Sequence, residues 1–220
     1  MESNNYILIG SSSELSKNFV DISKNRNIYT VSSKKLSSNN HLHVQDYFDE
    51  VDKIISFSQE VENPTIVFFN GFLAENRPSQ IPTIEDINQT VKINYLMPLF
   101  LSDILNSKIN IKKFVYISSF AAIKPRNKNF IYAQSKKLLE KTIISMELND
   151  YLFIRFGKIN TKFSAGHKNS IFDLDVKSAA EALSKSIDTK NGIVYPNLLT
   201  KFLSIIFYAL PTRIINKLKL

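Results

Sequence analysis

Cysteine is absent from this 220-residue sequence. Disulfide bonds and metal sites built on thiolates are therefore excluded, and the composition is compatible with a reducing compartment. Glycine is scarce, with five residues, whereas apolar residues make up 44% of the chain. This balance indicates a globular protein rather than a disordered one, and the length suits one domain with a sizeable core.

The sequence does not begin with the basic stretch and long apolar region that are typical of a signal peptide. Residues 1–5 are polar and acidic, and a predicted strand follows them. This beginning does not resemble a signal peptide, so we expect a cytoplasmic protein, with the inner membrane surface as an open alternative.

The formal net charge of +8 comes from lysine spread along the whole sequence. No basic stripe interleaved with aromatic residues stands out, so we expect no nucleic-acid partner. Attraction of anionic substrates or of a membrane surface stays open.

Apolar runs of strand length alternate with helical stretches. This order predicts an α/β fold, a Rossmann-like doubly wound parallel sheet of about seven strands with helices on both faces. The expected strands are 6–9, 28–31, 41–44, 65–69, 114–117, 152–155 and 193–195.

The expected helices are 14–24, 47–60, 84–107 with a kink at Pro98, 131–146 and 176–187. No repeat or low-complexity linker interrupts this order. We therefore expect a single dinucleotide-binding Rossmann domain with an integrated catalytic site over residues 1–197, followed by an apolar and basic helical tail over 198–220.

A hydroxyl, a phenol and an ammonium group follow one another near the fifth predicted strand. Ser119 lies just after that strand, Tyr132 follows thirteen positions later, and Lys136 is one helical turn further on. A phenol donates a proton at neutral pH only if its pKa falls from about 10, and a lysine on the same helix face can lower it. The spacing predicts the proton-donating half of a ketone reductase.

The first predicted strand ends in a segment that could bind a pyrophosphate. A glycine there allows a sharp turn, and free N–H groups at a helix start attract phosphate. The candidate residues are Gly10, Ser12, Ser13, Glu14 and Leu15. A plain strand-to-helix turn with serine caps is the alternative.

The loop after the second strand carries Ser32, Ser33, Lys34 and Lys35. An acidic residue here would bind an NAD ribose, whereas hydroxyls and cations suit the 2′-phosphate of NADP. A solvated polar loop is the alternative.

Two further segments complete the nucleotide half. Asp46, beyond the third strand, could accept a hydrogen bond from an adenine amino group or cap the next helix. Asn70 and Gly71 follow the fourth strand, where a small residue lets the backbone approach a cofactor, although they could equally form only a turn.

With these residues in order, the chain resembles the short-chain dehydrogenase/reductase family from about Tyr6 to Pro196. The resemblance rests on order and spacing. Gly10 follows the first strand, Asn70 the fourth and Ser119 the fifth, while Asn94 lies in the long helix and the segment 156–161 follows the sixth strand.

The resemblance implies roles for individual residues. Tyr132 would be the general acid toward a substrate carbonyl, and Ser119 would hold that carbonyl. Lys136 would lower the pKa of the phenol and bind the nicotinamide ribose. Asn94 would lie where the family bends its helix around a proton-passing water. Ile159 and Thr161 would contact the nicotinamide and a phosphate of an NADP cofactor, with NADPH preferred over NADH.

The sequence departs from the family at three positions, because Glu14 and Ser16 replace the second and third glycines of the turn and Phe156 replaces a proline. The run from Ser13 to Ser16 is nevertheless similar to a subgroup that includes polyprenyl-phosphate-linked ketosugar reductases. We therefore expect reduction of a ketone to an alcohol on a sugar or lipid-linked sugar in cell-wall or surface-polysaccharide biosynthesis. The alternatives are a lipid or other small carbonyl substrate, and a catalytically weak NADP-binding regulatory protein.

The remaining segments bear on substrate and partners. The short connection 162–175 is polar and basic around Gly166, His167 and Lys168, which favours an open pocket. The apolar tail could pack on the core or on a second subunit, or make peripheral membrane contact. The resemblance implies a homo-oligomer, either a dimer or a tetramer.

His41 and His43 point to the same side of a predicted strand, an arrangement that could hold a metal. Since no cysteine or acidic cluster lies beside them, we expect no metal site.

Overall fold

A computed structural model of the chain describes residues 4–74, 82–127, 129–146, 148, 150–164 and 173–217. The expected residues Gly166, His167 and Lys168 of the substrate segment lie outside these ranges, as do the last three residues of the tail.

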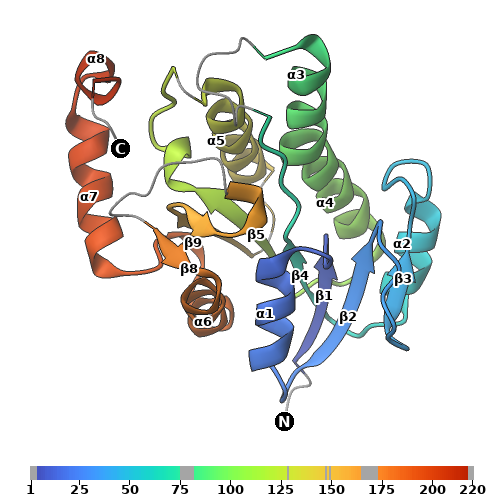
Figure 1. Ribbon diagram of the computed structural model, residues 1–220. Helices are drawn as coiled ribbons and strands as arrows, with labels where there is room; N and C mark the ends of the chain where they lie inside the picture. The colour runs from blue at the N-terminus through green and yellow to red at the C-terminus, as the bar shows by residue number, and fades with distance from the viewer. Residues whose placement is uncertain are drawn as a thin grey trace.

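Seven parallel strands form the main sheet in the order β3-β2-β1-β4-β5-β6-β9 (Figure 1). The predicted doubly wound sheet is therefore confirmed. Its strands are β1 (Asn5–Ile9), β2 (Asn27–Ser32), β3 (His41–His43), β4 (Thr65–Phe68), β5 (Lys113–Ser119), β6 (Tyr151–Phe156) and β9 (Gly192–Val194). The chain winds outward from β1 to β3 and then returns to β4 on the other side of β1, so the topological switch point lies between β1 and β4. In such sheets ligands bind at this point, beyond the carboxyl ends of the strands.

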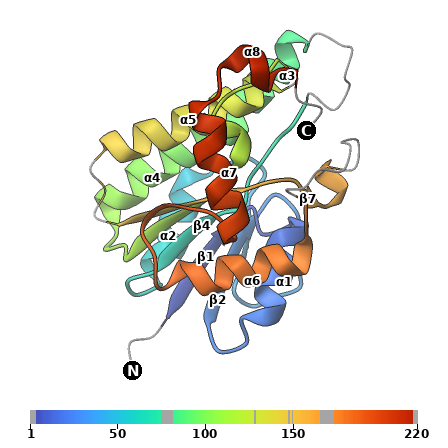
Figure 2. The same ribbon diagram turned by 90° about the vertical axis from the view of Figure 1, so that its left-hand side faces the viewer.

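Helices cover both faces of the sheet (Figure 2). They are α1 (Glu14–Ile22), α2 (Val51–Gln59), α3 (Ile84–Val91), α4 (Met97–Lys108), α5 (Phe130–Ser145) and α6 (Val176–Ile187). The helices α2, α4 and α5 pack on one face and α1 and α6 on the other.

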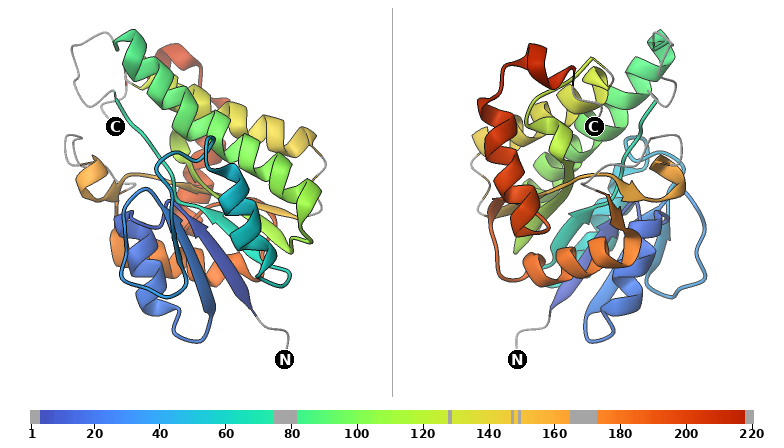
Figure 3. Two further views of the ribbon diagram at one scale, coloured as in Figure 1. Left: turned by 90° about the vertical axis from the view of Figure 1, so that its right-hand side faces the viewer. Right: turned by 60° about the vertical axis from the view of Figure 1, so that its left-hand side comes forward.

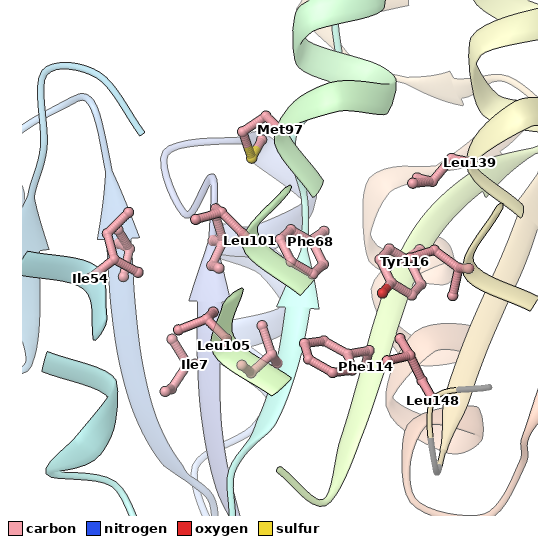
Figure 4. Packing of buried hydrophobic residues seen from close by; sticks show 14 of the residues in the cluster. Ile7, Ile54, Phe68, Met97, Leu101, Leu105, Phe114, Tyr116, Leu139 and Leu148 are labelled. Carbon is pink, nitrogen blue, oxygen red and sulfur yellow. The ribbon is translucent and has the colours of Figure 1, made fainter. Parts of the chain in front are cut away.

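The alternation of side chains along β1 explains the two layers. Ile7 and Ile9 join the core beneath α2, α4 and α5, whereas Tyr6 and Leu8 join the core beneath α1 and α6. Successive strand residues point to opposite faces, so a strand covered on both sides is apolar at every position. Figure 4 shows Ile7 packed with residues from β4, β5 and the helices of its layer.

The long helix predicted over 84–107 is interrupted. It begins at Thr83, whose side chain forms a capping box with Asp86, and it continues as α3. A π-helical segment η1 (Lys92–Leu96) then leads into α4, which carries Pro98 in its first turn. Proline lacks an N–H and crowds the preceding turn, so widening that turn to the π form relieves the conflict. The irregularity therefore lies in the turn before the proline.

Several short elements escaped sequence prediction. The strands β7 (Ile159–Asn160) and β8 (Leu174–Asp175) form a separate parallel pair, and the 3₁₀ segments η2 (Phe120–Ala122) and η3 (Lys162–Ser164) follow β5 and β7. Elements of two or three residues are too short to show a periodic pattern.

The tail forms α7 (Leu198–Ala209) and α8 (Thr212–Ile215), separated by Pro211. Phe207 and Ile215 pack against Phe120 and Ile123 in a small apolar cluster of their own. One side of the tail therefore packs on the domain. The division of the chain into a domain over residues 1–197 and a tail over 198–220 stays a prediction. Within the described ranges, no helix has the length and apolar character needed to cross a membrane.

Candidate active site

Gly10 ends β1 in a conformation that other residues rarely adopt, with φ of +79°. A Cβ at this position would lie 2.8 Å from the side-chain atoms Cγ and Oδ1 of Asn70. The N–H groups of Gly10 and Ser11 both donate to the Val31 carbonyl oxygen. The turn after β1 is thus held closely between the ends of β2 and β4, and only glycine fits.

The turn leads directly into α1. Ser13 caps this helix by accepting a hydrogen bond from the Ser16 N–H at 3.1 Å, so the predicted serine cap is present. Leu15 is buried, and Ser12 and Glu14 remain partly exposed beside it. Ser16 is buried too, and its Oγ has no hydrogen-bond partner among the described residues. A serine therefore fits where the family has its third glycine.

The loop after β2 presents exposed cations. The buried Ser32 hydroxyl donates to the Lys34 carbonyl oxygen at 2.7 Å, which folds the loop back on itself. Ser33, Lys34 and Lys35 are exposed. This geometry leaves the two ammonium groups available to an anion, as the predicted 2′-phosphate contact requires.

Asp46 is already hydrogen-bonded on both of its oxygens. Oδ1 accepts from the Phe48 N–H at 2.7 Å, and Oδ2 pairs with the Lys92 ammonium at 2.9 Å. The hydrogen bond from Lys92 is the largest of the effects that lower the pKa of this carboxyl. Asp46 thus holds the turn that precedes α2 and does not cap that helix, whose N-cap position is Glu50, while contact with an adenine stays a prediction.

Tyr47 is a residue that sequence reasoning missed. Its hydroxyl lies close to the Asn70 side chain and to backbone groups of Gly10 and Ser33. Burial raises the pKa of Tyr47, and hydrogen bonding to these three groups offsets part of the rise. Its position directly after Asp46 was the only available signal.

The segment after β4 is tied to the long helix. Asn94, fully buried in η1, donates to the Phe72 carbonyl oxygen at 2.7 Å and accepts from the Phe72 N–H at 3.0 Å. Gly71 is exposed between the two hydrogen-bonded neighbours Asn70 and Phe72. Asn94 thus lies at the helix irregularity, as the family resemblance implies, and its amide fixes the backbone beside the sheet edge.

Lys136 extends from α5 to the same edge. Its ammonium donates to the Ile117 carbonyl oxygen at 3.0 Å and to the Asn70 carbonyl oxygen at 3.5 Å. Burial lowers the pKa of Lys136 to about 8, while the Glu140 carboxylate acts in the opposite direction. The lysine therefore links the ends of β4 and β5.

Tyr132 and Ser119 lie together at the end of β5. The Ser119 Oγ accepts from the Ala121 N–H at 3.2 Å, which caps η2. Burial raises the pKa of Tyr132 to about 12, and hydrogen bonding to Ser119 offsets part of that rise. The expectation of a lowered phenol pKa is thus not met in this state of the chain. Tyr132 is instead a fully protonated phenol at neutral pH.

A buried ion pair lies one helical turn beyond Lys136. Arg155 donates to Glu140 through Nε at 2.9 Å and through a terminal nitrogen at 2.5 Å, and Glu140 also accepts from the Ser118 hydroxyl at 2.6 Å. A third Arg155 nitrogen donates to the Tyr195 hydroxyl. The sequence carried two signals for this network, an arginine inside an apolar strand and a carboxylate four residues after Lys136.

A hollow of about 570 Å³ opens between the start of α1 and the segment after β7. Its lining includes Glu14, Lys158, Thr161 and Lys162. The Thr161 N–H donates to the Ser164 hydroxyl, and the Lys162 N–H donates to the Glu14 carboxylate at 3.3 Å. Ile159, partly exposed in β7, leads into this lining. The hollow therefore lies where the predicted phosphate and nicotinamide contacts converge.

The described ranges hold no cluster of three or more histidine, cysteine or acidic side chains suited to a metal. The ring nitrogens of His41 face the Thr30 hydroxyl and the Lys34 carbonyl oxygen, at 2.9 and 3.1 Å. This histidine is thus engaged in holding β3 and the loop after β2.

Comparison with known proteins gives a clear answer for the fold alone. No protein-family model matches the sequence, and no curated protein sequence matches it. Many solved structures do match its fold.

Three of these structures illustrate the likeness. A short-chain dehydrogenase from Burkholderia cenocepacia, solved in complex with NADP, is similar with a TM-score of 0.78 and 16% identity over 94% of each chain. A carbonyl reductase from Pseudomonas aeruginosa has a TM-score of 0.69 and 17% identity, covering 88% of this chain and 96% of its own. Aldohexose dehydrogenase from Thermoplasma acidophilum has a TM-score of 0.70 and 13% identity, covering 90% and 94%. The architecture is thus that of the short-chain dehydrogenases/reductases.

Proposed function

We propose that this protein is an NADPH-dependent short-chain reductase that converts a ketone to an alcohol. The observation that carries the proposal is the convergence of Ser119, Tyr132 and Lys136 at the carboxyl end of β5. The Lys136 ammonium joins this group to Asn70, whose side chain in turn lies against Gly10 at the switch point. A proton donor and a nucleotide-binding turn are therefore neighbours.

The residues at the switch point suit a dinucleotide. Gly10 makes the sharp turn after β1 with a positive φ that favours glycine, the N-terminal end of α1 offers a positive dipole end, and the adjacent hollow is lined by Lys158 and Lys162. Glu14 opposes this, because its carboxylate also lines the hollow. We infer that the site accepts a dinucleotide and that Glu14 weakens its affinity.

The chain's own groups would serve the reduction as follows. Tyr132 would donate a proton to the carbonyl oxygen, with the Lys136 ammonium lowering the phenol pKa that burial raises. Ser119 would hold that oxygen by a hydrogen bond. Lys136 would bind the nicotinamide ribose and supply positive charge beside the phenol. A bound reduced nicotinamide supplies the hydride.

The preference for NADPH over NADH rests on the loop after β2. This loop has no acidic residue to bind a ribose 2′-hydroxyl, and it presents the exposed ammonium groups of Lys34 and Lys35. Ser32 shapes the loop through its bond to the Lys34 carbonyl oxygen. The structural neighbour from Burkholderia cenocepacia was solved in complex with NADP, which is in keeping with this preference.

For the substrate we propose a sugar or a lipid-linked sugar of cell-wall or surface-polysaccharide biosynthesis, handled in the cytoplasm at the inner membrane surface. The run from Ser13 to Ser16, similar to that of ketosugar reductases acting on polyprenyl-phosphate carriers, supports this class. A lipid or another small carbonyl compound is the alternative substrate.

A second candidate function is a binding or regulatory protein that retains the fold with weak turnover. It is favoured by Ser16, whose unpartnered hydroxyl occupies the position of a glycine in the nucleotide-binding turn.

We also propose a homo-oligomer, either a dimer or a tetramer. The support is two exposed apolar side chains on α5, Leu138 and Ile144, which are 47% and 41% exposed. Analytical ultracentrifugation of the purified chain would measure the assembly directly.

Titration with NADPH, followed by turnover on a panel of ketosugars, separates the candidate functions. Binding with oxidation of NADPH in the presence of a ketosugar supports the reductase. Binding without turnover on any carbonyl compound supports the regulatory alternative. Absence of NADPH binding would contradict both.

A further inference from the structure

The helix α7 turns the hydroxyl side chains of Thr200 and Ser204 inward and most of its large apolar side chains outward. It buries Thr200, Ser204 and Phe207 against the domain. Thr200 donates to the Asn197 side chain, and Ser204 donates to the Lys201 carbonyl oxygen. The inward hydroxyls therefore find partners at the helix itself, and they need none from the domain.

The outward face is strongly apolar. It consists of Leu198, Leu199, Phe202, Ile205, Ile206 and Tyr208, and we call it the α7 face. Leu198, Phe202 and Ile205 are 83%, 62% and 64% exposed, so they contribute little to the core. Figure 3 shows α7 at the outer edge of the molecule, with one side turned away from the domain. Six large apolar side chains on one helix surface indicate an interaction site.

The charge around the α7 face has one sign. Residues 189–220 contain five lysine and arginine residues and no aspartate or glutamate. Of these cations, Lys201 lies on α7, while Arg213 and Lys217 lie on and just after α8, and all three are exposed. An apolar helix face in a segment whose charged side chains are all cationic is complementary to an anionic lipid surface.

A second copy of the chain fits this surface less well. Two α7 faces packed on each other would bring the Lys201 and Arg213 groups of both copies together, and this part of the chain supplies no carboxylate to pair with them. Like charges brought together in this way oppose association.

We propose that α7 binds the surface of an anionic bilayer, lying in the plane of the interface. With twelve residues, the helix reaches about 18 Å, which is shorter than the hydrocarbon core of a bilayer. A helix of this length and pattern inserts its apolar face among the lipid headgroups.

The helix α7 contacts the segment that follows Ser119 in the candidate active site, so membrane binding would bring the site close to the lipid surface. The Phe207 ring packs edge-to-face on Phe120, with ring centroids 5.0 Å apart, and Phe120 directly follows Ser119. Lys124 donates to the carbonyl oxygens of Tyr208 and Leu210. The lipid-bound helix is thus fastened to the segment next to the catalytic serine. If the protein is the proposed reductase, this arrangement favours a substrate whose carbonyl is carried on a membrane lipid. This statement about the substrate rests on the proposed function.

Vesicle co-sedimentation of the full chain tests the proposal. We expect binding to vesicles that contain phosphatidylglycerol, weaker binding to pure phosphatidylcholine, and a decrease with added salt. The variant Phe202→Ser/Ile205→Ser should bind at least about tenfold more weakly, because it removes apolar area from the interface. Both side chains are exposed, and an unchanged circular dichroism melting curve would establish that the variant folds.

The matched control is Ile84→Ser/Leu96→Ser, which removes two exposed apolar side chains from α3 and η1. It should bind vesicles like the unaltered chain. Equal loss in both double variants, or absence of binding to anionic vesicles, would overturn the proposal. A concentration-dependent dimer that Phe202→Ser/Ile205→Ser alone dissolves would also overturn it and assign the α7 face to a second copy.

Vesicle binding is measured without nucleotide or substrate, so its failure is separate from a failure of the reductase proposal. Absence of NADPH binding would likewise leave the vesicle result standing.

Discussion

Two titrating groups at the end of β5 have pKa values displaced by burial in opposite directions. The pKa of Tyr132 rises to about 12, and that of Lys136 falls to about 8. Burial disfavours the charged form of each group, the phenolate in one case and the ammonium in the other. Burial therefore keeps the phenol protonated at neutral pH but makes it a weaker acid, so proton donation in reduction would require positive charge such as that of Lys136 to lower its pKa.

This difference predicts the pH dependence of reduction. The kcat/KM should be level below about pH 8 and fall above it, because Lys136 loses its ammonium proton as the pH rises through its pKa of about 8. The Tyr132 phenol stays protonated throughout that range. A profile of kcat/KM against pH for the purified chain measures this. A limb that rises with pH through the same range would contradict the assignment.

The charge of Glu14 at the start of α1 gives a second prediction. Replacing the carboxylate by an amide in Glu14→Gln should tighten NADPH binding about two- to fivefold, since a negative group at a helix N-terminus repels a phosphate that binds there. Fluorescence titration measures the Kd. Glu60→Gln, at the far end of α2, serves as control. Weaker binding in Glu14→Gln would show that the carboxylate supports the nucleotide site.

The ion pair of Glu140 and Arg155 belongs to the scale of elements, because it connects α5 with β6. The side chains are 3% and 15% exposed, so both charges are largely removed from water. A buried pair of this kind adds little net stability, but loss of one partner leaves an uncompensated charge.

We therefore expect Arg155→Leu to lower the free energy of unfolding by about 3 to 5 kcal/mol. The double variant Glu140→Leu/Arg155→Leu should lose less than the single variant, since it leaves no unpaired carboxylate. Urea denaturation measures both. A loss in the double variant as large as that of Arg155→Leu, or larger, would contradict the expected cost of an unpaired carboxylate.

The loop between β2 and β3 makes a prediction about cofactor choice. Lys34→Ser/Lys35→Ser should reduce the preference for NADPH over NADH by about tenfold or more, since charge-assisted hydrogen bonds to the 2′-phosphate are lost. The two Kd values give the ratio, and Lys141→Ser on α5 controls for the loss of surface charge. An unchanged ratio would remove both lysines from the nucleotide site.

The sheet could be predicted from the sequence because β1 and β4 carry continuous apolar runs, Tyr6 to Ile9 and Ile66 to Phe68, as a sheet covered on both faces requires. The segment η1 could not, because a π turn has no periodic signature and Pro98 predicts a kink at its own position. The Glu140–Arg155 pair required knowing that α5 packs beside β6. The sequence also could not show which side of α7 packs on the domain, because apolar residues lie on most sides of this helix.

At the scale of the whole molecule, the site is assembled from segments that are far apart in the sequence. Gly10, Asn70, Ser119 and Lys136 meet because parallel strands place all their carboxyl ends at one edge, and because the chain changes direction between β1 and β4. The positions of these residues directly after successive predicted strands, or on the following helix, were therefore sufficient to predict that they lie close together. These positions did not predict the present partners of site residues, such as Lys92 on Asp46.

The central claim is that Tyr132 delivers a proton to a ketone beside a bound nicotinamide. The most direct test follows the loss of reduced nicotinamide absorbance for the unaltered chain and for Tyr132→Phe, with the same ketosugar, alongside the Kd of each for NADPH. We predict a rate at least about a hundredfold lower in the variant, with NADPH affinity nearly unchanged. Turnover by Tyr132→Phe at the rate of the unaltered chain would contradict the account.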